Sequence, residues 1–187
     1  MPWQKSDLAT CGRRRFLCWS LAAGCGLLIP GARTASAARA PARQLSFYNL
    51  HTGESLRAVY WEGGHYLKDG LAEIDYVLRD FRTGEVRAID PQLLDLLHRL
   101  RHVMECDRPV HVISGYRSPA TNAMLARRSK GVAKNSYHVK GMAIDLRLPD
   151  RDLADLRAAA LALGGGGVGY YPKSNFVHMD TGPVRTW

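Results

Sequence analysis

Residues 136–145 read Ser-Tyr-His-Val-Lys-Gly-Met-Ala-Ile-Asp, and they place an imidazole and a carboxylate seven positions apart. The alternation of side chains after Gly141 predicts a short β-strand over residues 142–146. In such a strand Asp145 faces the side opposite to its apolar neighbours. Gly141 permits a tight turn before the strand. The segment therefore presents Asp145 from a rigid strand toward a region that His138 can reach.

A second polar pair occurs in residues 176–180, which read Phe-Val-His-Met-Asp and predict another strand. His178 and Asp180 share one face of that strand, and the apolar residues share the other. Two histidines and one carboxylate suffice to hold a catalytic zinc ion, which keeps its fourth position open. His138, Asp145 and His178 are therefore candidate ligands of a zinc ion. The alternative is a pair of hydrogen-bonded structural histidines and a surface aspartate, without metal.

The wider pattern resembles a known superfamily. The run Ser136-x-His138-x-x-Gly141-x-Ala143-x-Asp145, followed by a later strand histidine, is similar to the metal motif of the D-Ala-D-Ala metallopeptidase and Hedgehog-like superfamily. Further segments are similar to the murein endopeptidase K family, and they read Ile113-Ser114-Gly115-Tyr116-Arg117-Ser118, Gly131-Val132-Ala133-Lys134 and Gly166-Gly167-Val168-Gly169-Tyr170-Tyr171-Pro172. The similarity extends from Asn49 to Trp187. This resemblance implies a periplasmic zinc endopeptidase that acts on peptidoglycan stem peptides, with both histidines and the aspartate as ligands.

The sequence departs from the superfamily pattern at two positions. Many members have a glutamate, acting as general base, three residues before the last ligand, whereas this chain has Asn175, which cannot take a proton. Asp180 is the candidate base because it shares a strand face with His178. The alternative is that Asp180 fixes the imidazole of His178. Thr186 stands where close relatives often have a histidine, so any role of that side chain is absent.

Arg117 follows a predicted strand at residues 110–113 and matches the positive group that the superfamily places near the substrate. The resemblance implies that Arg117 stabilises the oxyanion formed at the scissile amide. The alternative is a solvent-exposed arginine at the start of a helix. Basic residues between 127 and 140 could attract carboxylates of the substrate, but such runs are more often solvated faces. Of Tyr170 and Tyr171, alternation predicts one ring in the core and one in the cleft wall.

Secondary-structure patterns favour an α+β fold in a single domain, because helices and short strands are mixed without βαβ regularity. We expect a small antiparallel sheet with flanking helices, arranged as the resemblance to the Hedgehog and D,D-peptidase group implies. The expected hairpin covers residues 45–50 and 55–61, the helices cover 69–81, 91–106, 118–128 and 153–163, and the remaining strands cover 110–113, 142–146, 168–171 and 176–180.

The N-terminal segment has the features of an export signal. Arg13-Arg14-Arg15-Phe16-Leu17 opens an apolar run that ends at Pro30, and Ala35-Ser36-Ala37 follows. The run is too short to cross a bilayer, so no transmembrane span is expected. We predict a signal peptide at residues 1–37, resembling the twin-arginine type, and a zinc peptidase domain at residues 38–187. The alternative is a basic amphipathic helix of a cytosolic protein.

The net charge indicates the kind of partner, and the cysteine content shows whether a disulfide can form. The net charge of +9 falls to +5 for residues 38–187, which contain 21 basic and 16 acidic residues. A positive exported domain suits an anionic polymer such as peptidoglycan. The export signal and the lack of nucleic-acid-binding motifs exclude nucleic acid as the expected partner. Cys106 is the only cysteine after residue 37, so it forms no disulfide within the domain.

The function expected from the resemblance is a zinc-dependent murein endopeptidase that hydrolyses the L,D cross-link between two diaminopimelate residues. A D,D-carboxypeptidase or D,D-endopeptidase with the same metal is the first alternative. A wall-binding module that retains zinc without catalysis is the second, and Asn175 is the residue that supports it.

Overall fold

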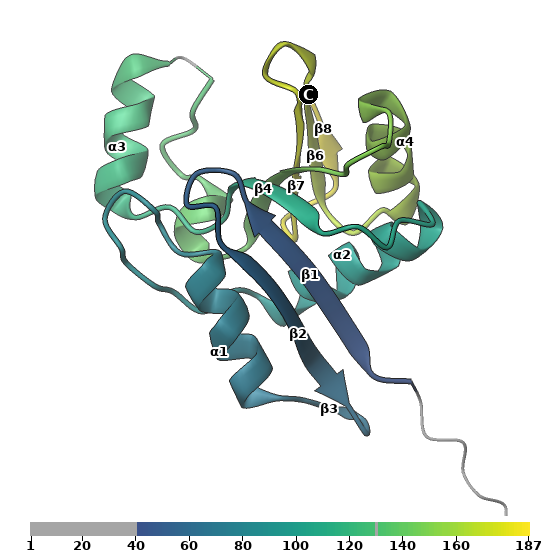
Figure 1. Ribbon diagram of the computed structural model, residues 1–187. Coiled ribbons are helices and arrows are strands. Elements are labelled where there is room, and N and C mark those ends of the chain that lie inside the picture. The colour runs from purple at the N-terminus through teal and green to yellow at the C-terminus, as the bar shows by residue number, and fades with distance from the viewer. Residues whose placement is uncertain (1–40, 130) are drawn as a thin grey trace, which may run out of the picture. The chain divides into compact units, whose positions relative to one another are not determined.

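The computed structural model describes residues 41–129 and 131–187. These residues form a single α+β domain, as the sequence predicts. Figure 1 shows one twisted sheet with helices packed around it. The predicted signal peptide at residues 1–37 and the basic residue Lys130 lie outside the described residues.

The sheet is larger and less regular than the predicted small antiparallel sheet. Within the described residues it has eight strands, in the order β3-β2-β1-β4-β5-β7-β6-β8. The pairs β1 with β4 and β6 with β8 are parallel, so the α+β fold is confirmed, but the sheet is mixed and is not small. The strands are β1 (Arg43–Asn49), β2 (Ser55–Glu62), β3 (His65–Tyr66), β4 (Val110–Ser114), β5 (Ala143–Arg147), β6 (Gly167–Tyr171), β7 (Phe176–Asp180) and β8 (Arg185–Thr186).

Three helices begin where capping residues stand in the sequence. Asp90, Ser118 and Asp152 each accept a hydrogen bond from a backbone N–H in the first turn of the following helix, which satisfies a donor that has no partner within the helix. Pro91 and Pro119 occupy first-turn positions, where no N–H is needed. The helices are α1 (Lys68–Val77), α2 (Pro91–Val103), α3 (Pro119–Arg128) and α4 (Leu153–Leu163), and the 3₁₀ turns are η1 (Tyr137–Lys140) and η2 (Pro172–Ser174).

Parallel pairing of β1 with β4 joins the N-terminal hairpin to the strands that carry the polar motif. Phe47 lies opposite Val110, and the backbone N–H of Leu50 donates to the carbonyl of Val112 at 3.0 Å. Parallel neighbours need a long crossover connection, which α1 and α2 supply. Because the paired residues are far apart in the sequence, local alternation of side chains does not reveal that the two parts share one sheet.

The core lies on the face of the sheet that α2 and α4 cover. α2 contacts β1 and α4, and α4 contacts β6 and β7. Ile144, Val177 and Met179 are fully buried there, which confirms the predicted inward faces of β5 and β7. Burial of each large aliphatic side chain contributes roughly 1.5–3 kcal/mol. α2 adds the buried residues Leu93, Leu94, Leu96, Leu97 and Leu100.

Gly70 provides a test of the packing between α1 and β2, because an added Cβ would overlap the backbone carbonyl oxygen of Val59. Exchanging glycine for alanine within a helix normally stabilises by roughly 0.5–1 kcal/mol, whereas forcing volume into a packed site costs about 1–3 kcal/mol. We expect Gly70→Ala to lower the free energy of unfolding, since a backbone atom cannot rotate away. Urea denaturation followed by circular dichroism measures the change.

Glu73→Ala, at an exposed position of the same helix, is the matched control and should unfold close to wild type. A Gly70→Ala protein as stable as this control would show that α1 does not lie as close to β2 as described.

Candidate functional site

His138 stands on η1, between a capping serine and a left-handed glycine. The Ser136 hydroxyl accepts a hydrogen bond from the backbone N–H of His138 at 3.3 Å. Gly141 ends the turn with a φ of 72°, which glycine adopts without strain. A Cβ at Gly141 would also overlap the carbonyl oxygen of Ala88. The glycine therefore lets the chain reverse from η1 into β5, which places His138 beside Asp145.

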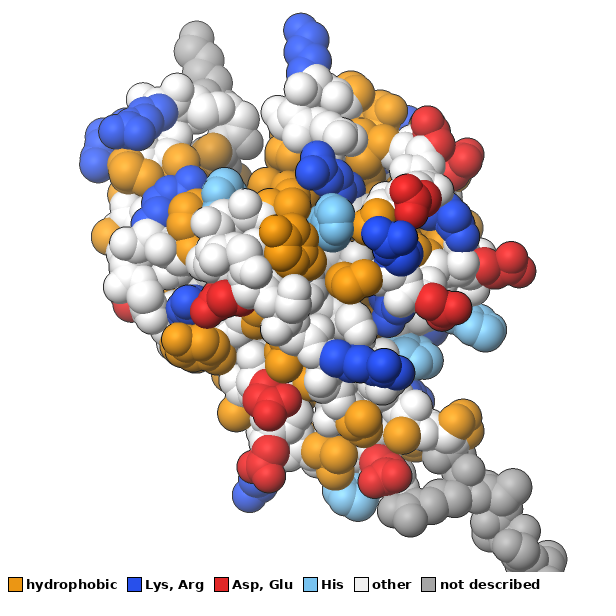
Figure 2. All heavy atoms as spheres, in the orientation of Figure 1, with side chains coloured by type: hydrophobic (Ala, Val, Ile, Leu, Met, Phe, Trp, Pro, Cys, Tyr) orange, Lys and Arg blue, Asp and Glu red, His pale blue; other side chains and the backbone are white. Residues whose placement is uncertain are grey.

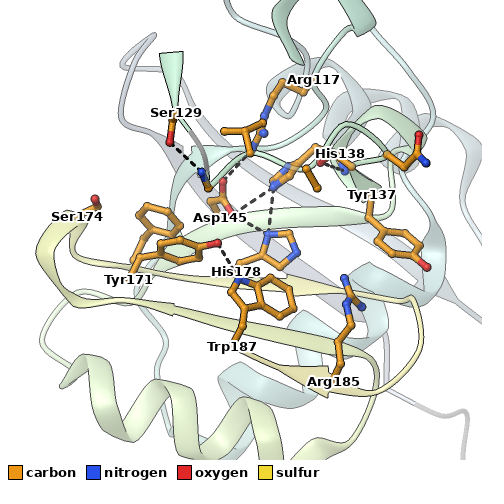
Figure 3. Close-up of a pocket in the computed structure, with 16 residues that line it drawn as sticks. Arg117, Ser129, Tyr137, His138, Asp145, Tyr171, Ser174, His178, Arg185 and Trp187 are labelled. Carbon is orange, nitrogen blue, oxygen red and sulfur yellow. Dashed lines mark hydrogen bonds and ion pairs between the residues drawn. The ribbon is translucent and has the colours of Figure 1, made fainter. Parts of the chain in front are cut away.

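Asp145 and His178 lie opposite each other on neighbouring strands. β5 and β7 pair antiparallel in a register that sets these two residues against each other. Asp145 Oδ1 lies 2.9 Å from His178 Nδ1 and 3.2 Å from His138 Nε2, and the two imidazole nitrogens are 3.2 Å apart. The three atoms form a compact triangle (Figure 3). The structure thus brings together the three residues that the sequence predicts as metal ligands.

The triangle fits one face of a tetrahedral metal site. Ligand atoms at about 2.0–2.2 Å from a four-coordinate zinc ion lie roughly 3.3–3.6 Å from one another. The separations of 2.9–3.2 Å between the three atoms are close to that spacing. Two imidazole nitrogens and one carboxylate oxygen are also donors that such a metal accepts. The three side chains can therefore hold a divalent metal ion and leave a coordination position for a further ligand.

Both histidines have a partner on the side away from the triangle. His138 Nδ1 lies 2.7 Å from the carbonyl oxygen of Gly115, which can only accept, so this nitrogen carries the hydrogen. His178 Nε2 lies 2.9 Å from Asp180 Oδ2 and donates to it. These contacts leave His138 Nε2 and His178 Nδ1 with lone pairs that face the triangle. Outer hydrogen bonds of this kind fix the tautomer and the ring orientation that metal binding requires.

The electrostatics of the triangle follow from its burial. Burial lowers the pKa of His138, which favours the neutral imidazole. Burial alone would raise the pKa of Asp145, but the two neighbouring histidines outweigh it and lower that pKa below its usual range. Burial lowers the pKa of His178, whereas hydrogen bonds to Asp145 and Asp180 raise it overall. His138 and Asp145 thus favour the forms that bind metal, the neutral imidazole and the ionised carboxylate, whereas a metal ion would have to displace a proton from His178.

The three residues line an open cleft of about 620 Å³. Figure 2 shows the molecule hollowed between the side that carries α3 and the turn that joins β6 to β7. The walls come from the loop after α3, from η1, from β6 and β7, and from the chain around β8. They include Ser129, Tyr137, Tyr171, Ser174, Arg185 and Trp187.

Comparisons with known proteins agree with this geometry. Residues 36–187 match the sequence model of the peptidase M15 subfamily described as peptidoglycan L,D-endopeptidase MepK. The chain belongs to this family. It is 44% identical over 181 residues to the peptidoglycan L,D-endopeptidase MepK of Escherichia coli strain K12, an alignment that covers 97% of this chain and 100% of the relative. It is 43% identical over 161 residues to the probable peptidoglycan L,D-endopeptidase MepK of Haemophilus influenzae, covering 86% of this chain and 87% of the relative.

The family membership confirms the resemblance that the motif spacing indicates. Peptidases of this family are generally metal-dependent, and the triangle of His138, Asp145 and His178 is a group that could bind the metal. Among the described residues, no helix is both long enough and apolar enough to cross a membrane.

Asp180 contacts the side of the His178 ring that faces away from His138 and Asp145. Its carboxylate is fully buried and faces His178 Nε2, the nitrogen that points away from the other two ligands. It also accepts hydrogen bonds from the backbone N–H groups of Gly167 and Gly182 and from Arg185 at 2.7 and 3.0 Å. Burial raises its pKa, but the bonds from His178 and Arg185 lower it overall. This geometry favours the alternative in which Asp180 fixes the imidazole over the alternative in which it is the base.

Arg117 lies in the cleft wall beside Asp145. Its Nη2 donates to Asp145 Oδ2 at 3.1 Å. The residue is only 8% exposed, which excludes the alternative of a solvent-exposed arginine. Burial lowers the pKa of Arg117, and the charge of Asp145 opposes that shift. Asp80 anchors the loop because its buried carboxylate accepts from the backbone N–H of Ser118 at 2.8 Å.

The chain around β8 brings two residues to the cleft that sequence patterns did not single out. The indole ring of Trp187 lies 5.3 Å from the imidazole of His178, measured between ring centres. Arg185 forms the two hydrogen bonds to Asp180 and also lines the cleft. A two-residue strand has no periodicity, so the only available signal was the presence of an arginine and a tryptophan near the end of the motif region.

Other sequence expectations have clear outcomes. Tyr171 lines the cleft and Tyr170 packs against the core, as strand alternation predicts. Asn175 ends η2 with a φ of 52° and does not line the cleft. Thr186 is exposed and does not line it either. The described basic residues between 127 and 140 are exposed and stay outside the cleft lining, as a solvated face would.

The contact between Asp180 and His178 predicts a change in metal affinity. Asp180→Asn keeps the size of the side chain but removes the charge that accepts the hydrogen of His178 Nε2. Outer partners of metal-binding histidines typically contribute 10–100-fold to affinity, so we expect metal affinity to fall by about that factor. Competition with a chromophoric chelator measures the affinity of the refolded, metal-loaded protein.

Asp95→Asn is the matched control. Asp95 is a half-buried carboxylate that accepts hydrogen bonds from Arg43, Tyr60 and Tyr66 at the far end of the sheet. Its loss should alter stability without altering metal affinity. Unchanged affinity in Asp180→Asn, with reduced turnover, would restore the interpretation of Asp180 as the base.

Proposed function

We propose that this chain is a zinc-dependent murein endopeptidase that hydrolyses the L,D cross-link between diaminopimelate residues of neighbouring stem peptides. The observation that carries the proposal is the ligand triangle of His138, Asp145 and His178 in an open cleft, in a chain that belongs to the MepK family. Relatives that are 43–44% identical bear the name peptidoglycan L,D-endopeptidase. Zinc is the metal that best suits two imidazoles, one carboxylate and an open fourth position.

Hydrolysis of the amide requires that a water oxygen bond to the carbonyl carbon, that the C–N bond break and that the amine leave with a proton. When bound, zinc polarises the carbonyl and makes water a better nucleophile at neutral pH. The protein holds the three donor atoms in place through the Gly115 carbonyl, Asp180 and Arg117. Arg117 also presents positive charge at the cleft wall, where it stabilises the oxygen that becomes negative.

The charge of the cleft supports a substrate that carries carboxylates. Among the described lining residues, Asp145 is the only carboxylate, whereas Arg117 and Arg185 are both cationic; Arg117 pairs with Asp145, and Arg185 pairs with Asp180 outside the lining. A diaminopimelate cross-link has carboxylates close to the scissile amide, and arginine recognises carboxylates with strong charge-assisted hydrogen bonds. A 4-3 cross-link ending in D-alanine offers fewer such groups at the same place. The preference for the L,D link follows from this difference together with the names of the relatives.

Export completes the proposal. Residues 1–37 carry the paired arginines, the short apolar run and the small-residue site of a twin-arginine signal peptide. Removal of this segment leaves residues 38–187 as the zinc peptidase domain in the periplasm, where the cell wall lies.

The substrate preference is tested with two purified cross-linked dimers. We expect the zinc-loaded domain to cleave the 3-3 linked dimer faster than the 4-3 linked dimer at neutral pH. A chelator should abolish both reactions and added zinc should restore them. Separation of the muropeptides by liquid chromatography with mass spectrometry identifies the bond that is cut.

His178→Ala serves as the inactive control because it removes one donor of the triangle. Faster cleavage of the 4-3 dimer would favour a D,D-peptidase. Binding of sacculi without cleavage of either dimer would favour a wall-binding module that keeps zinc for structure.

The export route is tested by replacing both Arg13 and Arg14 with lysine, which keeps the charge but removes the paired arginines. We expect the protein to disappear from the periplasmic fraction and the precursor to accumulate, as detected by immunoblotting. Arg33→Lys, in the same segment but outside the pair, is the control. Normal periplasmic amounts of the double variant would contradict the twin-arginine route.

A further inference from the structure

A tyrosine hydroxyl in the cleft wall stands out because the cleft offers few groups that can act on the substrate. Arg117, to which the proposed function gives the stabilisation of the negative oxygen, also pairs with Asp145. Asp180 lies behind His178, and Asn175 lies outside the lining. The hydroxyl of Tyr171 lines the cleft instead. Figure 3 shows this hydroxyl pointing toward the region between Asp145 and His178.

The fold fixes the position of Tyr171 from two sides. Its ring stacks on that of Phe176, with ring centres 4.5 Å apart and planes within 19°, and the two residues are paired neighbours on β6 and β7. Trp187 contacts the hydroxyl end of the tyrosine, and its indole ring lies over a glycine of β6. A Cβ at Gly169 would come within 2.7–2.9 Å of three atoms of the indole. The absence of a side chain at Gly169 therefore makes room for Trp187 next to the site.

The hydrogen bond between Trp187 and Tyr171 sets the direction of the tyrosine hydroxyl. Trp187 Nε1 donates to Tyr171 Oη at 2.7 Å. An indole N–H can only donate, so the tyrosine oxygen must be the acceptor and its own hydrogen points elsewhere. Among the described residues no acceptor for that hydrogen is found, and the hydroxyl lies in the cleft. The hydrogen is thus available to a substrate oxygen.

We propose that Tyr171 is a further catalytic residue, whose hydroxyl donates a hydrogen bond to the scissile carbonyl oxygen as that oxygen becomes negative. Trp187 is a positioning residue that holds the hydroxyl in this direction. The proposal rests on the proposed amide hydrolysis. The hydroxyl keeps its hydrogen throughout, while the water oxygen bonds to the carbonyl carbon and the C–N bond breaks. Donors fixed in advance toward a developing oxyanion typically contribute 10²–10³-fold to kcat.

Tyr171→Phe isolates the hydroxyl, because the stacked ring and its contact with Phe176 remain. We expect the zinc-loaded variant to lose about 10²–10³-fold in kcat on the 3-3 linked dimer, with KM nearly unchanged, since the bond forms mainly in the transition state. Tyr170→Phe is the matched control, because it removes the neighbouring hydroxyl on the core side of the same strand and should retain wild-type kcat.

Trp187→Phe removes the indole N–H and keeps an aromatic ring. We expect a smaller loss, about 10-fold in kcat, and no further loss when this change is added to Tyr171→Phe, because both variants act through one hydroxyl. If the two side chains only shaped the cleft, each variant would instead raise KM, and the two effects would add in the double variant.

Two measurements do not depend on turnover. Metal content by elemental analysis should be the same in wild type, Tyr171→Phe and Tyr170→Phe. Calorimetric titration with a phosphinate analogue of the 3-3 linked dimer should show weaker binding to Tyr171→Phe by the same factor as the loss in kcat/KM. The analogue carries a charged oxygen where the oxyanion forms, so it reports the proposed bond directly.

The outcomes separate this inference from the function on which it rests. If wild type cleaves the dimer and Tyr171→Phe cleaves it equally fast, or binds the phosphinate equally well, the role of Tyr171 is overturned and the function stands. If wild type cleaves neither dimer, the proposed function is overturned, and this inference with it.

Discussion

Antiparallel pairing of β5 with β7 is the constraint on which the candidate site depends. The register sets Asp145 against His178 and Ile144 against Met179, so the polar pair faces the cleft while the apolar pair enters the core. A slip of one residue would turn every side chain of the strand to the other face and would expose Val177 and Met179. Burial of the apolar face therefore fixes the geometry of the ligands, and packing energy far from the cleft keeps two donor atoms 2.9 Å apart.

The ligands come from one region of the chain, but their orientation depends on several. His138 is held by the backbone carbonyl of Gly115 at the end of β4, and His178 is held by Asp180. Arg185, the first residue of β8, neutralises Asp180 in turn. A buried carboxylate without such partners would be costly, so the C-terminal strand stabilises the site although it contributes no ligand.

Local patterns predicted most elements, since side-chain periodicity is a local signal, and the resemblance of the motif predicted the three residues that the structure brings together. Local patterns could not predict that β1 pairs with β4 or that β8 joins β6, because both pairings link distant residues. The interpretation of Asp180 was undecided for a related reason. A strand pattern shows that Asp180 shares a face with His178, but only the coordinates show that it contacts Nε2 while Nδ1 faces the triangle. The place of Trp187 and Arg185 in the cleft was not predicted, because a two-residue strand is too short to show side-chain alternation.

The N-terminal half of the domain also supports the site, through residues that lie outside the cleft lining. The carbonyl of Gly141 accepts from the N–H of Asp90 at 2.9 Å, and the Asp90 carboxylate accepts from the Thr181 hydroxyl at 2.6 Å. This chain of bonds links the start of α2 to the turn before β5 and to the end of β7. Asp80 likewise anchors Ser118, next to Arg117. The segment between α1 and α2 thus anchors the turn before β5 and the loop that carries Arg117, so residues before β4 help to position side chains of the site that come after it.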